Sequence, residues 1–410
     1  MLDLINFAHD SLDSGSKAIS IFIDLAKAFD TLDFEILLQK LSMYGAEGKT
    51  LSWFRSYLTG RKQQVQLPCG TVSGQCDVTT GVPQGSVLGP LLFIIYINDL
   101  PKCIPLLKVI LFADDTSCLY RARNDSELFS TLNSQLEGLA DFFGANKLSL
   151  NVRKTRSMAF LPHDCHFHYQ DILLDNEKVT WIKPDSPNSE PHYKFLGVLL
   201  DPGLTFKEHI SKISGKLSSA IFAVANSQKV LPRKVVLGVY RALFESHMLY
   251  CCAVWGSARP KLLLPLNALQ TKALKIMFCL PRASHVSPLL YEHKLLRLHD
   301  LIKKEQVSII HQLRTGRLPP ALQNIAKPMD PAESLHRVAR NSEYDYTQPA
   351  LSHPDLYYHP KPKIIAAYNS LPFLLKAAPL NCFRSELKSH ILSSYSRPCD
   401  KVHCSACVEK

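Results

Sequence analysis

Apolar and polar residues alternate in blocks along the first 161 residues, and these blocks predict both strands and helices. Short apolar runs without helical spacing predict strands at 18–25, 108–113, 116–121 and 156–161. Apolar residues at helical spacing predict helices at 33–44, 50–58, 91–100 and 125–146. Asp33 is the expected N-cap of the first helix. The order β-α-β-β-α-β is that of a split βαβ unit, so we predict an α+β fold with an antiparallel sheet and helices on one face.

The pattern changes twice in the rest of the chain. Residues 162–191 are polar and contain Pro, with a hairpin expected around Asn176 and a further strand at 193–200. Helical spacing follows at 206–225, 233–250, 262–278 and 298–313. From Pro319 onward, Pro and polar residues dilute the pattern, which predicts a loosely ordered tail. The expected divisions are 1–161, 162–204, 205–318 and 319–410.

The positive charge is concentrated in the second helical region. The chain carries a formal net charge of +11, and residues 201–320 alone hold 18 Lys and Arg against 6 Asp and Glu, a local excess of +12. A localised excess favours a polyanionic partner. The alternative is a solvated helical surface without a nucleic-acid partner.

Neither secretion nor membrane insertion is predicted by the sequence. The first residues lack the basic, apolar and small-residue order of a signal peptide. The strongest apolar run, 91–97, is much shorter than the roughly 20 residues that cross a bilayer. We therefore expect a soluble intracellular protein, with the nucleus and the cytoplasm both open. Isolated Cys residues such as Cys118, Cys251 and Cys279 are expected to be small, reduced core residues.

Two acidic sites lie at the ends of predicted strands. Asp24 closes the first strand, and Asp114 and Asp115 lie between the two strands of the central hairpin. In a split βαβ sheet these strands are neighbours, so the acids are expected to converge. Clustered carboxylate oxygens suit Mg²⁺, and two such ions can catalyse phosphoryl transfer. Taken singly, Asp24 could instead be an N-cap, and the Asp-Asp pair an ordinary turn.

The loop Gly81-Val82-Pro83-Gln84-Gly85-Ser86-Val87-Leu88-Gly89-Pro90 carries the most specific signal. Its Gly residues let backbone approach a ligand closely, and Gln84 offers both a donor and an acceptor. The alternative is a plain Gly/Pro turn before a helix. Together with Phe22 to Asp30 and Phe112 to Asp115, this loop resembles reverse transcriptases, in particular those of non-LTR (LINE-type) retrotransposons. The resemblance extends over about residues 2–318.

The resemblance implies a right-hand polymerase palm followed by an α-helical thumb, and an RNA-directed DNA polymerase activity. The implied cofactor is two Mg²⁺ ions, with Mn²⁺ possible, and the implied partners are an RNA template, a DNA primer and dNTPs, with no membrane. Asp24, Asp114 and Asp115 match the catalytic and metal-binding acids. The template and nucleotide loop is matched by Gly81, Pro83, Gln84 and Gly85.

Three further sites follow from the resemblance. Phe29 lies where the family places an aromatic gate against the ribose 2′-OH, although it could equally be a core Phe. Lys154 matches a lysine thought to protonate pyrophosphate, although a solvated surface Lys is an alternative. Phe195, Leu196 and Gly197 match the primer-grip hairpin; taken alone they predict only a core strand with a Gly bulge.

The sequence also departs from the family pattern. Only 23 residues precede Asp24, so we expect a truncated piece without fingers and without an endonuclease, which would not polymerise efficiently. The alternatives are an inactive remnant that only binds nucleic acid, and another palm polymerase of the group II intron or telomerase type. In the tail, Cys399, His403, Cys404 and Cys407 have loose metal-ligand spacing, which chance clustering also explains.

Overall fold

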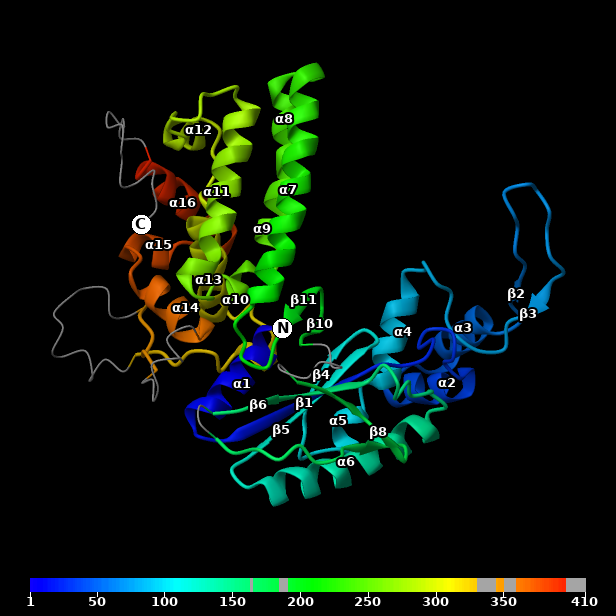
Figure 1. Cartoon of the computed structure of the whole chain (residues 1–410). Helices are drawn as coiled ribbons and strands as arrows, with labels where there is room; N and C mark the ends of the chain where they lie inside the picture. Colours follow the sequence, from blue (N-terminus) through cyan, green and yellow to red (C-terminus); the bar gives the residue numbers. More distant parts are fainter. Residues whose placement is uncertain (163–164, 184–190, 330–343, 350–358, 396–410) are drawn as a thin grey trace. The chain divides into compact units, whose positions relative to one another are not determined.

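The computed structural model describes residues 1–162, 165–183, 191–329, 344–349 and 359–395, and it divides the chain into two compact units (Figure 1). We call Ser14–Tyr193 the sheet unit. We call Met1–Asp13 together with the residues from Lys194 onward the helical unit. None of the described helices is both long and apolar enough to span a membrane.

The sheet unit is built on five strands in the order β4-β5-β1-β6-β9. Their bounds are β1 Lys17–Ile23, β4 Lys108–Phe112, β5 Asp115–Ala122, β6 Arg156–Phe160 and β9 Thr180–Ile182. The first four strands pair antiparallel in the order of a split βαβ unit, as the sequence predicts. The purely antiparallel prediction was incomplete, because β9 joins β6 in parallel.

One face of this sheet carries the main hydrophobic core. Ile19, Ile21 and Ile23 alternate along β1 and are almost fully buried. They share one apolar cluster with residues of α2 (Phe34–Met43), α4 (Leu88–Ile97) and α6 (Asp125–Ala145). Helix α6 lies below the sheet in Figure 1, and the short helix α5 (Leu100–Cys103) packs on α6. The predicted fold class, α+β with helices on a sheet face, is confirmed for this unit.

Helix α4 begins earlier than the sequence analysis predicted. The prediction started it at Leu91, after the Gly/Pro loop, whereas the helix starts at Leu88. Pro90 is tolerated because the first N–H groups of a helix have no intrahelical partner. The Ser86 hydroxyl also accepts a hydrogen bond from the Gly89 N–H at 3.0 Å. The last part of the motif loop is therefore the first turn of a helix.

Smaller elements complete the sheet unit. Helix α3 spans Gly48–Leu58, and an exposed ribbon pairs β2 (Lys62–Gln63) with β3 (Cys76–Asp77). The hairpin predicted around Asn176 is present as β7 (Leu173–Leu174) and β8 (Glu177–Lys178).

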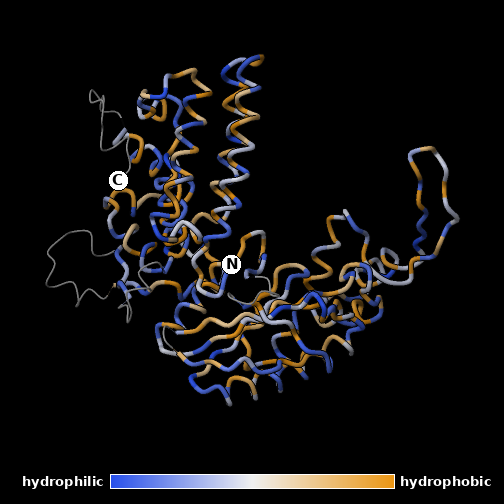
Figure 2. The backbone as a smooth tube through the Cα atoms, in the orientation of Figure 1, coloured by the Kyte–Doolittle hydropathy of each residue, from blue (hydrophilic) through white to orange (hydrophobic). Residues whose placement is uncertain are grey.

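The helical unit contains α1 (Leu2–Asp13) and a series of helices after β10 (Tyr193–Phe195) and β11 (Val198–Leu200). The longest are α7 (Lys207–Val230) and α11 (Pro260–Met277), which pack on each other. Both alternate between hydrophilic and hydrophobic residues along their length (Figure 2). The remaining helices before the tail are α8 Arg233–Tyr240, a π-helical turn Arg241–Glu245, α9 Ser246–Leu249, α10 Cys252–Trp255, α12 Ser287–Glu292 and α13 Leu298–Arg314.

The prediction of a loosely ordered tail was wrong for its described residues. They include α14 (Pro360–Asn369), α15 (Phe373–Ala377) and α16 (Leu380–Ser393), and both α14 and α16 pack on α13. Several of the Pro residues that suggested a loosely ordered tail lie at or just before the starts of these helices: Pro360, Pro372 and Pro379. The predicted Cys399–Cys407 metal cluster lies outside the described residues.

Two other expectations differ from the structure. The N-terminal helix α1, predicted as part of 1–161, belongs to the helical unit. There the rings of His9 and His359 lie 4.2 Å apart, and Lys361 bonds Asp10 at 3.2 Å.

Of the three Cys residues predicted in the core, Cys118 is buried, but Cys251 is half-buried and Cys279 is exposed.

Candidate active site

The register of the central strands brings the predicted acids to one end of the sheet. Strands β1 and β5 pair antiparallel from Lys17 opposite Ala122 to Ile23 opposite Thr116. Asp24 and Asp115 each come one residue beyond this last pair, on neighbouring strands. Asp114 lies in the two-residue turn between β4 and β5, after Ala113 in the left-handed region at φ 52°. Asp24 is half-buried, whereas Asp114 and Asp115 are exposed.

A tyrosine that the sequence analysis did not single out lies close to these acids. Burial raises the pKa of Tyr193 to about 12, and the charges of Asp115 and Asp24 contribute to the same shift. Two carboxylates from different strands therefore act on one hydroxyl. The Tyr193 ring stacks on Phe22 at 4.2 Å, which holds it against the strand that leads to Asp24. The only sequence signal was an aromatic residue two positions before Phe195.

The segment that carries Lys154 lies directly against Asp24. The Asn151 N–H donates to the Asp24 carbonyl at 2.9 Å, and the Asp24 N–H donates to the hydroxyl of Thr155 at 3.3 Å. Thr155 is fully buried, so its hydroxyl is a second residue that the sequence analysis missed. Lys154 itself is exposed, on the turn between these two anchor points. The turn thus places a flexible cation beside the acidic end of the sheet.

The Gly-rich loop is fastened to the segment that follows Asp24. The Gly81 and Val82 N–H groups donate to the carbonyls of Leu32 and Phe29 at 2.8 and 2.9 Å. Gly81 has φ 80°, and a Cβ on it would lie 2.6 Å from the Asp30 carbonyl oxygen. This contact explains the requirement for Gly at position 81.

Two side chains complete this part of the site. The Gln84 amide donates to the Asp30 carboxylate at 2.8 Å, so its orientation is set by a residue that the sequence analysis did not assign. The Phe29 ring is half-buried and lies 4.8 Å from Phe93, tilted by 34°. One side of Phe29 therefore packs on the core while part of the ring stays accessible.

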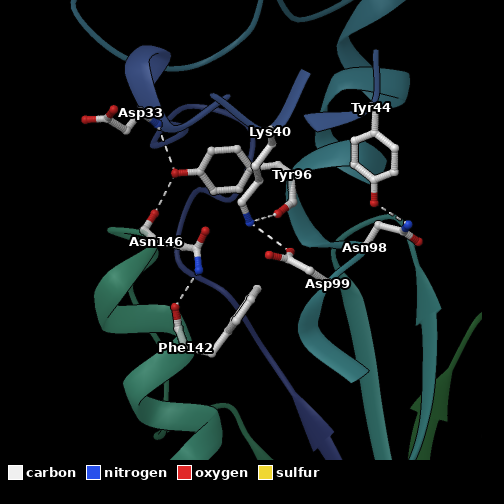
Figure 3. A network of polar contacts seen from close by, with 8 residues as sticks. All are labelled: Asp33, Lys40, Tyr44, Tyr96, Asn98, Asp99, Phe142 and Asn146. Carbon is white, nitrogen blue, oxygen red and sulfur yellow. Dashed lines mark hydrogen bonds and ion pairs between the residues drawn. The ribbon is translucent and has the colours of Figure 1, made fainter. Parts of the chain in front are cut away.

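A buried polar network holds the helices behind the site together (Figure 3). The Tyr96 hydroxyl, on α4, donates to the Asn146 carbonyl at 2.6 Å and accepts from the Asp33 N–H at 3.4 Å. Lys40, on α2, donates to the Asp99 carboxylate at 2.8 Å and to the Tyr96 carbonyl at 2.5 Å. Asp33 caps α2, as predicted. The network therefore fixes α2, α4 and the end of α6 relative to one another.

The residues matching the primer grip form a tight hairpin in the helical unit. Leu196 and Gly197 occupy the turn between β10 and β11, with φ 45° and 82°. Positive φ at both turn residues is the type I′ geometry that suits antiparallel hairpins. Phe195 is buried, and the Tyr250 hydroxyl donates to the Leu196 carbonyl at 2.6 Å. The Gly is thus a turn residue and not the bulge that was the alternative expectation.

The acidic end of the sheet has the chemistry of a site for a hard cation. Its three side chains offer only carboxylate oxygens, and neither Asp24 nor Asp114 forms a salt bridge with a described Lys or Arg. In the described part of the chain, no group of three or more His, Cys, Asp or Glu side chains is already drawn together to hold a metal ion.

Comparisons with known proteins show which family this part of the chain resembles. Residues 3–200 match the family described as reverse transcriptase (RNA-dependent DNA polymerase). Over 273 residues, 65% of this chain, it is 27% identical to a probable RNA-directed DNA polymerase from transposon X-element of Drosophila melanogaster. Over 284 residues, 66% of this chain, it is 27% identical to the RNA-directed DNA polymerase from mobile element jockey of Drosophila funebris. The chain spans 29% and 30% of the length of these two relatives.

Among solved structures, a telomerase from Candida albicans aligns with a TM-score of 0.37 and 13% identity, over 67% of this chain and 52% of that one. The family match covers every predicted site residue from Asp24 to Gly197. Residues 3–200 are thus a reverse transcriptase (RNA-dependent DNA polymerase) domain, and the similar proteins are RNA-directed DNA polymerases of mobile elements of the non-LTR, LINE type.

Proposed function

We propose that the sheet unit is the catalytic centre of an RNA-directed DNA polymerase that extends a DNA primer on an RNA template with dNTPs. The observation that supports this most strongly is the convergence of Asp24 with Asp114 and Asp115 at one end of β1 and the β4–β5 hairpin. The charges of Asp115 and Asp24 both raise the pKa of Tyr193, in keeping with this convergence.

The acids are the residues that would hold divalent metal. Asp24 and Asp114 are the proposed shared ligands, with Asp115 beside them, and Mg²⁺ fits their all-oxygen donor set, with Mn²⁺ as a substitute. Bound there, two such ions would supply charge stabilisation for the attacking 3′-oxygen and the leaving pyrophosphate. The role of the carboxylates would be to fix the ions, and correct positioning of reacting groups can supply roughly 7–11 kcal/mol of a barrier.

The surrounding residues would act on the nucleotide and the primer. The accessible backbone of the loop at Gly81, Pro83 and Gly85 offers close approach to a base pair, and Gln84 is held ready by Asp30. Phe29 would exclude a ribose 2′-OH by steric contact. Lys154, on the turn beside Asp24, would donate a proton to the departing pyrophosphate. The hairpin at Phe195, Leu196 and Gly197 would support the primer end.

Primer extension tests this proposal directly. The assay uses the 410-residue chain, an RNA template with a DNA primer, Mg²⁺ and dNTPs. As the sequence analysis predicts inefficient polymerisation, we expect slow extension, and this slow extension should fall at least about a hundred-fold in Asp114→Asn, because a lost metal ligand removes several kcal/mol of charge stabilisation. Asp175→Asn is the matched control, since Asp175 is an exposed acid at the tip of the β7–β8 hairpin. Equal rates in the two variants, or no extension with intact duplex binding, would overturn the proposal.

A further inference from the structure

A cavity of about 990 Å³ lies within the helical unit and takes no part in the proposed chemistry. Its walls come from α11, from the loop that follows it, from α12 and from the start of α13 (Figure 1). Ligand sites in proteins have volumes of roughly 300–1,000 Å³. This cavity is therefore large enough to admit several side chains of a partner.

The floor of the cavity is apolar. Leu274, Val286 and Leu290 line it and are almost fully buried, whereas Ile276 is half-buried and Leu264 is 41% exposed. Covering such apolar surface is favourable by roughly 25 cal/mol for each Å² removed from water. The floor therefore favours an occupant with apolar side chains of its own.

The charged part of the lining is entirely basic. The cations that line the cavity are Lys272, Lys275, Arg282 and Arg297. None of the described lining residues is Asp or Glu, and residues 260–297 hold six Lys and Arg against a single acid. Lys272 and Arg282 are exposed, and neither forms a salt bridge with an acid in the described part of the chain. An acidic occupant would supply the missing counter-charge.

The same lining favours a peptide over a nucleic acid as the occupant. Proteins that bind single strands stack the bases on aromatic rings, and no Phe, Tyr or Trp is among the described residues that line the cavity. A duplex offers mainly phosphates and sugars, which would leave the apolar floor uncovered. An amphipathic helix offers apolar side chains for the floor and carboxylates for the exposed cations.

Side-chain hydrogen bonds hold the walls of the cavity together. The buried Gln270 amide of α11 donates to the Leu296 carbonyl at 2.9 Å and accepts from the Leu298 N–H at 3.1 Å. The Arg297 guanidinium donates to the Ser287 hydroxyl at 2.6 Å, which joins the start of α13 to α12. A site whose walls are already fixed binds at a smaller cost in conformational entropy.

We propose that this cavity is a docking site for an acidic, amphipathic helix of a partner protein. Apolar side chains about one helical turn apart would enter the cavity and cover its floor, and flanking Asp or Glu residues would pair with Lys272 and Arg282. The inference does not depend on the proposed polymerase activity. It assigns part of the positive charge of residues 201–320 to protein binding instead of nucleic-acid binding.

The first test follows the methyl signals of Ile, Leu and Val in the full-length chain by NMR. The probe is a synthetic peptide, about four helical turns long, with Leu at helical spacing and Glu or Ala at every other position. Addition of the peptide should shift the signals of Ile276 and Leu290, whereas Ile310, buried in α13 outside the cavity, should not move.

Two control ligands decide what kind of site it is. A scrambled peptide of the same composition has no apolar face, and a single-stranded RNA of the same net charge has no apolar side chains. Neither should shift the two cavity signals. An equal response to the scrambled peptide, a response to the RNA as strong as that to the probe, or no response to the probe overturns the proposal.

The second test measures the affinity of the same peptide for matched variants. Ala268→Glu places a carboxylate at an exposed position of the cavity wall, and Ala366→Glu makes the same change at an exposed position of α14 outside the cavity. Lys272→Glu and Lys261→Glu form a second pair on α11, in which only Lys272 lines the cavity. We expect the first member of each pair to weaken binding at least about ten-fold and the second to bind as the wild type does. Equal losses within either pair would show diffuse attraction only and overturn the docking site.

Discussion

At the scale of single residues, Phe29 shows how one ring can serve two roles. It packs at 4.8 Å on Phe93, in the core behind the site, yet it is only half-buried. The loop that carries the proposed nucleotide contacts is hydrogen-bonded to the Phe29 carbonyl through the Val82 N–H. A ring anchored on one side and open on the other is suited to a steric gate, because the gate must not yield when a ribose 2′-OH meets it.

Phe29→Val separates the two roles. We expect the variant to incorporate ribonucleotides at least about ten-fold more readily than the wild type, because the clash of roughly 1.4 kcal/mol or more is removed. The measurement is primer extension with dNTP and rNTP in competition. A loss of thermal stability with unchanged sugar discrimination would assign Phe29 to the core alone.

The meeting of Asp24 with Asp114 and Asp115 at one end of the sheet could be predicted from the strand order, whereas the Gly-rich loop was identified by its resemblance to reverse transcriptases. Asp24 and Asp114–Asp115 stand at the ends of apolar strands, where a carboxylate needs a partner. Tyr193, Thr155 and Asp30 could not be predicted in the same way. Their roles depend on which backbone groups and charges lie across the fold, and a Tyr, Thr or Asp of this kind is unremarkable in its own segment.

At the scale of elements, the close fit between the loop and the segment after β1 is the feature that sets the site. Gly81 approaches the Asp30 backbone so closely that a Cβ would lie 2.6 Å from its carbonyl oxygen, whereas a Cβ at Gly85 would meet nothing within 4 Å. Both Gly residues have nearly the same φ, 80° and 82°. The two positions therefore differ in contact but not in backbone strain.

Gly81→Ala and Gly85→Ala form a matched pair. Each should lose roughly 1–2 kcal/mol from left-handed strain, and Gly81→Ala should lose about 1–3 kcal/mol more from overpacking against Asp30. Hydrogen exchange of the β1 amides gives the free energy of opening of the sheet unit for each variant. Equal losses in the two variants would contradict the contact between the loop and Asp30.

The positions of elements were predicted well where the residue spacing or a capping residue fixed where an element begins. Examples are α2, which Asp33 caps, and the β4–β5 hairpin at Asp114. The start of α4 was missed by three residues because Gly and Pro were taken as loop residues. In the structure both belong to a first helical turn, which needs no N–H from Pro90. The composition of the segment does not reveal this early helix start, because the start is supported by the hydrogen bond from the Gly89 N–H to the Ser86 hydroxyl.

At the scale of the whole molecule, the two units carry different properties. The sheet unit holds the acids and the Gly-rich loop, and the helical unit holds the concentrated positive charge of residues 201–320. The described residues after 318 belong to the helical unit and pack within it. His311 of α13 is fully buried, and its ring stacks at 3.7 Å on Phe383 of α16. The sequence pattern did not predict this packing, because the apolar faces of α14 and α16 are short and are separated by Pro residues.

Truncation after residue 318 should therefore destabilise the helical unit but not the sheet unit. We expect α13 amides to exchange at least about ten-fold faster when Phe383 and its neighbours no longer cover them, with β1 amides unchanged. Truncation after residue 395 is the control, because it keeps α14 to α16. Equal protection of α13 in both truncated chains would show that the tail contributes nothing to that unit.

The central claim is that Asp24, Asp114 and Asp115 form one divalent-metal site. It is tested most directly by replacing Mg²⁺ with Fe²⁺ and generating hydroxyl radicals at the bound ion, which cleave backbone within a few ångströms and require no primer, template or turnover. The account predicts cleavage near residue 24 and near residues 113–115 in the same protein, suppressed by excess Mg²⁺ and lost in Asp114→Asn but not in Asp175→Asn. Cleavage at only one of the two segments, or the same pattern in Asp114→Asn, would contradict it.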